Sequence, residues 1–167
     1  MKYDLLGIGN ALVDIEVHVD DAFIEQNSLV KGGMTLLSLE NQQKILKELH
    51  GLSTKISSGG SAANTIHGLS VLGGKAYYFG RVANDIYGKY YAEDMMSCGV
   101  GFSGTGNGAS NTGTCVILVT PDSERTMLTH LGVSSSLHPD NVDEEPIENS
   151  TMVYIEGYLW TGEDTRK

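Results

Sequence analysis

Short apolar runs that stop at turn residues recur along the chain and predict buried strands. Two of them cover residues 3–8 and 152–155, and the first ends in the glycine-rich turn GIGN. Residues 14–20, DIEVHVD, instead alternate apolar and polar positions, which predicts a strand with one face in water. Two further runs, 114–120 and 125–131, surround a Pro-Asp turn and predict a β-hairpin.

Helical periodicity occurs between these runs. Ser38 can cap a helix that continues to about His50, with its apolar positions on one side. A helix of small residues is expected over 62–72, where a Gly-Gly pair ends it, and another near 87–97, where Cys-Gly ends it. A strand over 76–79 separates these two helices. Strands that alternate with helices need crossover connections, so we expect an α/β protein with a largely parallel sheet.

Composition narrows the kind of protein. The 167 residues suit one domain of ordinary size, and a hydrophobic content of 40% is too high for a disordered chain. The formal net charge of −10 disfavours a nucleic-acid backbone or an anionic membrane surface as the partner. Glycines and an aspartate interrupt the N-terminal apolar run, so neither a secretion signal nor a membrane span is expected. Cys98 and Cys115 are the only cysteines, which excludes a disulfide framework and favours a reducing, cytoplasmic location.

Several nucleotide-binding and catalytic motifs are missing from the sequence. Leu12 stands where a third glycine would complete a dinucleotide fingerprint begun by Gly7 and Gly9. The P-loop, the G-x-S-x-G nucleophile turn and the H-E-x-x-H zinc motif do not occur, and the five histidines show no ligand spacing. The sequence therefore predicts no metal site.

Asn10 and Asp14 follow the first predicted strand, at the edge where open α/β sheets bind ligands. An ionised carboxylate offers only acceptor oxygens, so Asp14 suits a pair of neighbouring hydroxyl groups on a sugar. The alternative is an aspartate in a solvated turn, which the residue types alone favour.

The segment GGSAAN, residues 59–64, combines a flexible turn with a helix start. Gly59 and Gly60 allow a close backbone approach, unpaired N–H groups are expected at the helix start, and Asn64 projects from the first turn. Such a platform can bind a polar ligand. A βα turn packed tightly against a neighbouring element explains the same residues equally well.

Arg125 opens the second strand of the predicted hairpin, in a chain with only 11 lysines and arginines. Either it is an exposed residue that aids solubility, or its forked guanidinium reaches an anionic group.

Taken in order, these segments resemble the N-terminal part of the PfkB, or ribokinase-like, family of carbohydrate and nucleoside kinases. The most specific stretch is GGSAANTIHGLSVLGGKAYYFGRVANDIYGKYYAEDMMSCGV, residues 59–100, and GIGNALVD and NTGTCVILVTPDSERTM also match. The resemblance covers essentially the whole chain and is closest to adenosine kinases and their bacterial relatives. It implies an α/β fold, the N-terminal half of a ribokinase-like three-layer α/β/α domain with a small β-sheet lid.

The resemblance also implies roles for individual residues of a sugar pocket. Asn10 and Asp14 would hold ribose hydroxyls, and Gly59, Gly60 and Asn64 would line the same pocket. A lid that closes over this pocket would exclude water.

Three further residues are placed around that pocket by the resemblance. Cys115 and Tyr158 would lie near the aglycone or the lid. Arg125 would lie at the phosphate end of the site.

One part of the family pattern, a Gly-Ala-Gly-Asp sequence, does not occur in these residues. It supplies the catalytic base and helix-start amides for the phosphates, so no catalytic residue is expected in this chain. The family also has an Asn-x-x-Glu motif associated with magnesium; residues 141–144, NVDE, match its residue types, but no metal site is expected in this chain. The last residues, TGEDTRK, resemble the start of a helix. We therefore expect 1–167 to be an incomplete kinase domain, with lid strands at about 14–20, 33–38 and parts of 113–131, and with its C-terminal ATP-binding part outside this chain.

The resulting expectation is an ATP- and Mg²⁺-dependent phosphotransferase that acts on a nucleoside or sugar hydroxyl, adenosine being favoured, with the chain inactive by itself. The alternatives are a ketose, ribose or sugar-acid kinase of the same family, and a non-catalytic ligand-binding fragment. The expected partner is a small molecule, with no nucleic acid and no membrane. The oligomeric state stays open, with a homodimer through the lid as one arrangement.

Overall fold

The computed structural model describes residues 2–106 and 110–166. The chain forms two compact units. Unit 1 comprises Met1–Val13, Ser58–Gly113 and Leu131–Lys167, and unit 2 comprises Asp14–Ser57 and Thr114–His130. Residues 107–109, in the polar loop expected after Gly104, lie outside the described residues.

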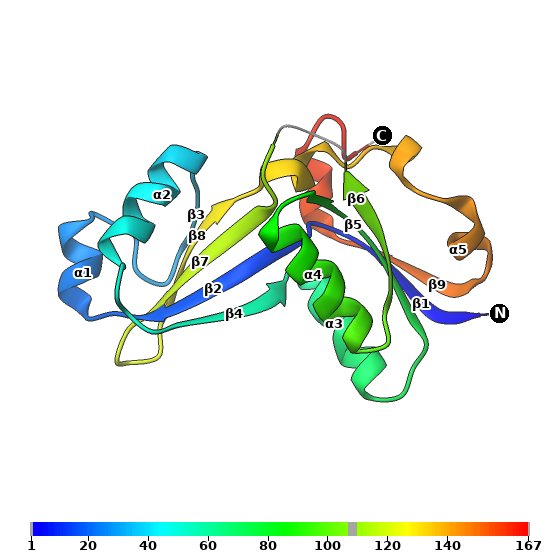
Figure 1. Ribbon diagram of the computed structural model, residues 1–167, viewed down its shortest axis with the longest axis horizontal. Helices are drawn as coiled ribbons and strands as arrows, with labels where there is room; N and C mark the ends of the chain where they lie inside the picture. The colour runs from blue at the N-terminus through cyan, green and yellow to red at the C-terminus, as the bar shows by residue number, and fades with distance from the viewer. Residues whose placement is uncertain (1, 107–109, 167) are drawn as a thin grey trace. The chain divides into compact units, whose positions relative to one another are not determined.

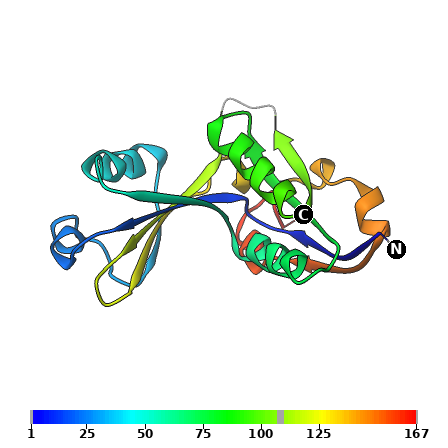
Figure 2. The same ribbon diagram turned by 60° about the horizontal axis from the view of Figure 1, so that its bottom comes forward.

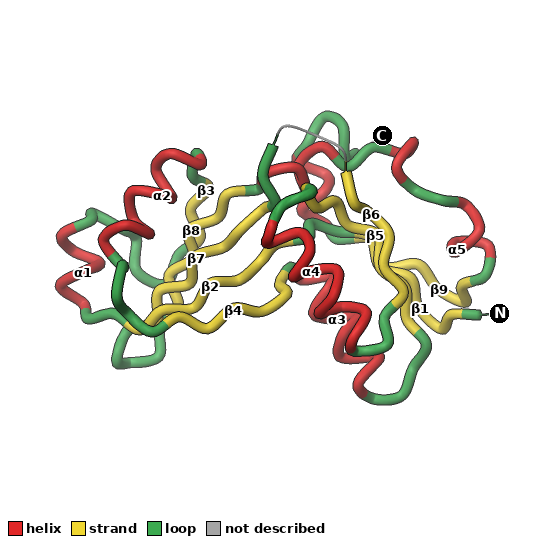
Figure 3. The backbone as a smooth tube through the Cα atoms, in the orientation of Figure 1, coloured by secondary structure: helices red, strands yellow, loops and turns green. Residues whose placement is uncertain are grey.

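Unit 1 is built on a four-stranded sheet with the order β6-β5-β1-β9 (Figures 1 and 3). Its strands are β1 (Tyr3–Ile8), β5 (Ala76–Ala83), β6 (Gly101–Gly106) and β9 (Ser150–Ile155). All three pairings are parallel, so the largely parallel sheet expected from the sequence is confirmed. The apolar run at 3–8 forms the inner strand β1, on which a helix packs. The expectation that 152–155 is buried is wrong, because β9 is an edge strand whose apolar residues are exposed.

Two helices cover this sheet: α3 (Ser61–Val71) packs on β1 and β5, and α4 (Ile86–Ser97) packs on β5 and β6. The ring of Tyr78 on β5 meets the rings of Tyr91 on α4 and Phe102 on β6, with centroids 6.4 and 6.2 Å apart. Tyr78 and Tyr91 are fully buried, so this aromatic cluster forms part of the core of unit 1. Both helices end at the expected glycines, Gly73 and Gly99, which have positive φ.

The polar stretch between β8 and β9, for which the sequence indicated no element, contains short helices. They are the 3₁₀ helices η1 (Gly132–Ser136) and η2 (Pro139–Asn141) and the α-helix α5 (Glu144–Glu148), and a further 3₁₀ helix, η3 (Gly157–Thr161), follows β9. Each spans five residues or fewer, too short for a periodic apolar pattern to be recognised.

Unit 2 is built on a five-stranded sheet with the order β3-β8-β7-β2-β4. Its strands are β2 (Leu12–His18), β3 (Met34–Leu36), β4 (Thr54–Gly59), β7 (Gly113–Val119) and β8 (Arg125–His130). The β7–β8 hairpin is antiparallel, as predicted, and the β3–β8 pair is parallel, which makes the sheet mixed. Figure 2 shows the hairpin as two long strands joined by a turn. Ile15 and Val17 of β2 are buried between partly exposed polar neighbours, which confirms the predicted alternation.

The helices of unit 2 are α1 (Asp21–Gln26) and α2 (Leu39–Glu48). Ser38 caps α2 by accepting a hydrogen bond from the backbone N–H of Asn41, so the predicted helix start is confirmed. Gln42 of α2 is 1% exposed. Its amide nitrogen donates to the carbonyl oxygens of Thr114 and Leu128 at 3.1 and 2.9 Å, and its oxygen accepts from the Thr114 hydroxyl at 2.6 Å. These bonds fasten α2 to the hairpin.

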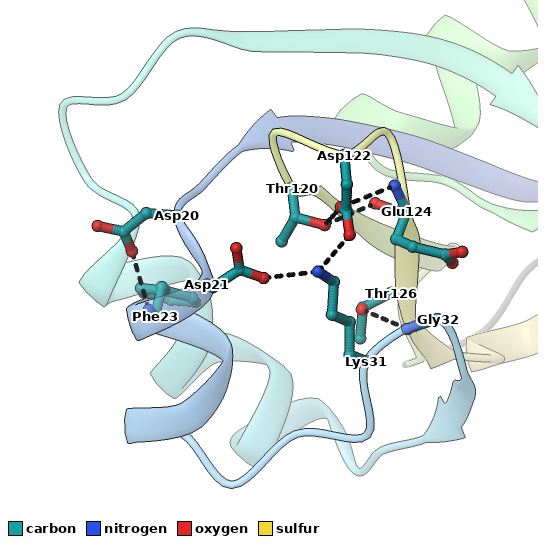
Figure 4. Close-up of polar contacts among 9 residues, drawn as sticks. All are labelled: Asp20, Asp21, Phe23, Lys31, Gly32, Thr120, Asp122, Glu124 and Thr126. Atoms are coloured by element: carbon teal, nitrogen blue, oxygen red, sulfur yellow. Dashed lines mark hydrogen bonds and ion pairs between the residues drawn. The ribbon is translucent and has the colours of Figure 1, made fainter.

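Lys31 makes a second link within unit 2, at the turn of the hairpin (Figure 4). Its ammonium nitrogen lies 2.6 Å from carboxylate oxygens of both Asp21 at the start of α1 and Asp122 in the turn. Hydrogen bonds from the ammonium group to Asp122 and Asp21 raise the pKa of Lys31 to about 12 and lower the pKa of Asp122. All three side chains are partly exposed, so water and salt weaken their contribution to stability.

Three further elements escaped the sequence analysis, two because of their composition and one because of its length. The strand β6, GFSGTG, is rich in glycine, and β4, TKISSG, contains a single large apolar residue. The helix α1 spans only six residues. Pairing with a neighbouring strand supplies the hydrogen bonds that these poor strand sequences do not specify locally. In the described ranges, no helix is long and apolar enough to span a membrane.

Candidate functional site

Unit 1 brings four of the predicted site residues together at the carboxyl end of β1. Asn10 follows β1 by two residues, Gly59 ends β4, and Gly60 is the N-cap of α3. Gly60 has a φ of 103°, and a Cβ there would lie 2.2 Å from the backbone oxygen of Asn10. Only glycine allows α3 to begin this close to Asn10.

Asn64 occupies the first turn of α3, where its backbone N–H donates to the carbonyl oxygen of Gly60 at 2.9 Å. Its side chain is exposed. The carbonyl oxygen of the buried Gly59 accepts a hydrogen bond from the Tyr91 hydroxyl at 3.0 Å, which holds the end of β4 against α4. The exposed amide of Asn64 and the fixed glycine turn therefore form a polar platform within unit 1.

The carboxylate of Glu156 lies against the start of α3, although no role was expected for this residue from the sequence. It is 3% exposed and directly follows β9. It accepts hydrogen bonds from the N–H of Ala62 at 3.1 Å and from the Ser61 hydroxyl at 2.9 Å. The expectation of unpaired N–H groups at this helix start is therefore wrong for Ala62. The sequence offers one hint of this position, because the acid directly follows an apolar strand parallel to β1 and the carboxyl ends of parallel strands meet at one edge.

Tyr158 lies in η3, two residues beyond Glu156. Its side chain is 61% exposed, so the ring is accessible to solvent or a ligand. Its carbonyl oxygen accepts a hydrogen bond from the Thr161 hydroxyl at 2.8 Å, which stabilises the 3₁₀ turn that carries it.

Unit 2 groups the other three predicted residues, Asp14, Cys115 and Arg125. Burial raises the pKa of Asp14 to about 6, while the positive charge of Arg125 acts in the opposite direction. Burial likewise raises the pKa of Cys115 to about 11, and both Asp14 and Arg125 act on the thiol electrostatically. The three side chains are thus electrostatic neighbours. Asp14 is mostly ionised at neutral pH and can accept hydrogen bonds from hydroxyl groups.

Neither a metal-binding cluster nor a phosphate site at the start of α3 is supported by the described residues. In residues 2–106 and 110–166, no group of three or more His, Cys, Asp and Glu side chains could hold a metal. The N-terminus of a helix such as α3 can bind a phosphate, but at the start of α3 the carboxylate of Glu156 already accepts a hydrogen bond from the N–H of Ala62. A phosphate there would meet a buried negative charge, so the start of α3 does not fit the phosphates of ATP.

Comparison with known proteins places the chain beside nucleoside and sugar kinases. It is 39% identical to an adenosine kinase from Sinorhizobium meliloti of known crystal structure, with a TM-score of 0.91 over 99% of this chain and 50% of that one. A crystal structure of a probable sugar kinase protein from Rhizobium etli CFN 42 matches with 36% identity, the same TM-score and the same coverage. Adenosine kinase 2 of Arabidopsis thaliana is 26% identical over 170 residues, which are 96% of this chain and 49% of the plant protein.

The chain spans about half the length of these relatives. Its fold corresponds to the N-terminal half of ribokinase-like adenosine kinase structures, with a parallel sheet and a mixed, lid-like sheet, so the expected fold class is confirmed. The model of the pfkB family carbohydrate kinases matches residues 28–165. The chain therefore belongs to the PfkB family of carbohydrate kinases.

Proposed function

We propose that the protein containing this chain is an ATP-dependent kinase that phosphorylates a hydroxyl group of a nucleoside, adenosine being the favoured substrate. The observation that carries this proposal is the likeness to the S. meliloti adenosine kinase, which extends over 99% of the chain. Family membership supports ATP as the phosphoryl donor.

The residues of this chain bind and orient the acceptor in this proposal. Hydrogen-bonding groups for the sugar come from Asn10 after β1 and from Gly59, Gly60 and Asn64 around the start of α3. Asp14 accepts hydrogen bonds from the hydroxyls of the sugar. Correct orientation of the acceptor hydroxyl converts a two-body encounter into a reaction within one complex, which is a large part of phosphoryl-transfer catalysis.

In this proposal, the base and the phosphate end of the acceptor are contacted by Cys115, Tyr158 and Arg125. The buried thiol of Cys115 and the exposed ring of Tyr158 contact the base, and the guanidinium of Arg125 faces the phosphate end. The strands β2, β3, β7 and β8 act as a lid that excludes water from the reacting groups.

The proton of the acceptor hydroxyl is taken by a group outside these 167 residues, because the Gly-Ala-Gly-Asp sequence that supplies the family's base does not occur in them. ATP and Mg²⁺ are bound by that other part as well. The 167-residue chain by itself is therefore expected to show no turnover.

A panel of acceptors tests the proposal. The complete protein is incubated with ATP, Mg²⁺ and one acceptor at a time: adenosine, guanosine, inosine, ribose, fructose or a sugar acid. Adenosine is expected to give the highest kcat/KM. Failure to phosphorylate any of these acceptors would overturn the kinase assignment.

A second candidate function is phosphorylation of a free sugar or sugar acid. It is favoured by the equal structural likeness to the probable sugar kinase of R. etli. A kcat/KM that is higher for ribose, fructose or the sugar acid than for any nucleoside would establish this function in place of the first.

A further inference from the structure

Glu156 makes four hydrogen bonds from a buried position in unit 1. Beside those from Ser61 and Ala62, its Oε1 accepts from the side-chain Nδ2 of Asn10 at 2.7 Å and from the backbone N–H of Asn10 at 3.3 Å. The partners are 94 to 146 residues away along the chain. One carboxylate therefore joins the carboxyl end of β9 to Asn10, two residues beyond β1, and to the start of α3.

Gly9 leaves space for the carboxylate of Glu156, and the N-terminus of α3 is capped by it. A Cβ on Gly9 would lie 2.8 Å from Oε2 of Glu156, so a side chain at that position would displace the acid. The N-cap of α3, Gly60, has no side chain to cap the helix, and Glu156 performs this function from another strand. A negative charge at a helix N-terminus is also favoured by the helix dipole.

The hydrogen bond from Nδ2 determines which atom Asn10 offers to a ligand. A carboxylate only accepts hydrogen bonds, so the NH₂ group of Asn10 must face Glu156. The remaining polar atom is the carbonyl oxygen Oδ1, and no donor in the described part of the chain contacts it. Asn10 thus presents an acceptor.

We propose that Glu156 is a positioning residue, which orients Asn10 so that its Oδ1 accepts a hydrogen bond from a hydroxyl of the acceptor sugar. The proposal rests on the proposed function and deepens it, because it specifies that Asn10 selects a hydroxyl donor. Glu156 acts through Asn10 and the start of α3 and makes no contact with the substrate.

A glutamine cannot replace Glu156 in this role. Two of the donors are backbone N–H groups, which cannot reverse their direction, and a third is the NH₂ of Asn10, which does so only if the amide turns over. The NH₂ group of a glutamine would oppose an N–H donor on one side or the other. Either Asn10 turns over or α3 loses its cap.

The test compares Glu156→Gln with the unaltered complete protein. We expect the KM for adenosine to rise about tenfold, the equivalent of about 1.4 kcal/mol, while the KM for ATP changes less than about twofold. Glu156→Asp keeps the charge with a shorter reach, so its effect on the KM for adenosine should be smaller, and it serves as the test if the glutamine variant does not fold.

Asp85→Asn is the matched control. Asp85 is also a carboxylate of unit 1 that caps a helix, and it accepts from the N–H of Gly88 at 2.8 Å and from the N–H and hydroxyl of Thr112 at 2.9 and 2.7 Å. It does not contact Asn10. Asp85→Asn should lower the melting temperature without a selective rise in the KM for adenosine.

Substrate analogues report on the direction of the hydrogen bond. Replacing the 2′- or 3′-hydroxyl of adenosine by fluorine leaves an acceptor but removes the donor. At the hydroxyl position that hydrogen-bonds to Asn10, the fluorine analogue should bind to the unaltered protein as poorly as the deoxy analogue does. The loss of affinity relative to adenosine should be smaller in Glu156→Gln.

Three outcomes are distinguishable. An equal rise in the KM for adenosine in the variants of Glu156 and Asp85 would show a purely structural role and overturn the proposal. Fluorine analogues at both positions that bind as well as adenosine would overturn the presentation of Oδ1. An unaltered protein that phosphorylates no acceptor would overturn the proposed function, and the positioning role with it.

Discussion

Asp14 illustrates how a single residue can be unfavourable for the fold and still be useful to a site. Burial raises its pKa to about 6 although Arg125 opposes the shift. A carboxyl group whose pKa is higher in the folded state than the ordinary 3.8 binds its proton more tightly when folded. Its favourable contribution is complete below pH 3.8 and is lost as the pH rises through 6. At neutral pH the ionised Asp14 therefore destabilises unit 2.

We expect Asp14→Asn to increase the free energy of unfolding at pH 7.5 by roughly 1 to 3 kcal/mol, since two pKa units correspond to about 2.7 kcal/mol and Asp14 is not fully buried. At pH 4 the gain should be small. Chemical denaturation at both pH values measures it, and the acceptor affinity of the complete protein should fall in the same variant. A gain in stability without a loss of acceptor affinity would contradict the proposed role of Asp14.

Asp85 provides a control of opposite sign for this experiment. Burial acts to raise the pKa of Asp85, but hydrogen bonds from Thr112 and Gly88 outweigh it and the pKa is lowered. A lowered pKa stabilises the fold above pH 3.8, and the contribution is lost as the pH falls through the folded pKa. Asp85→Asn should therefore destabilise the protein at pH 7.5, where Asp14→Asn stabilises it.

At the scale of elements, unit 2 depends on polar contacts as well as on apolar packing. The buried Gln42 connects α2 to the β7–β8 hairpin through three hydrogen bonds, and Lys31 connects the turn of that hairpin to α1. The contacts of Gln42 should contribute more to the free energy of unfolding than those of Lys31, because water competes with an exposed ion pair and does not compete with a buried amide.

Gln42→Leu is expected to lower the free energy of unfolding by roughly 1 to 3 kcal/mol, because it leaves the Thr114 hydroxyl without its buried partner. Gln43→Leu, the same change at the exposed neighbouring position of α2, should alter it by less than about 0.5 kcal/mol. Urea denaturation of both variants measures the difference. Equal effects would show that the buried amide contributes no more than a surface residue.

At the scale of the whole molecule, the described residues leave an apolar strand at one edge of the parallel sheet. β9 pairs only with β1 in the sheet order, and Met152, Val153 and Ile155 are 59%, 44% and 55% exposed. An exposed apolar strand at the edge of a sheet is a template for association with another chain.

A protein of these 167 residues made alone is therefore expected to self-associate, and Val153→Lys should reduce that association by placing a charge on the edge. Val71→Lys is the control, because Val71 is 68% exposed at the end of a helix and has no strand edge beside it. Light scattering as a function of concentration measures the effect. If both variants reduced self-association equally, the added charge and not the strand edge would be its cause.

Local patterns were enough to locate most of the elements. The apolar run of β1, the alternation of β2, the serine cap of α2 and the turn of the hairpin each depend on residues within one strand or one helical turn. The same local reading singled out Asn10 and Gly60, and the structure places them against each other. Their role in binding a sugar stays a prediction.

Most of the elements, the family and the residue types available for a site could thus be read from the sequence. That the glycine-rich β6 and the polar β4 are strands became apparent only in the folded chain, because their hydrogen bonds come from neighbouring strands. The same holds for the contacts of Glu156 with Asn10 and α3, since partners 94 to 146 residues apart leave no signal in a local pattern. Local sequence specifies what a segment can form, and the burial of a polar group specifies which distant partner it must find.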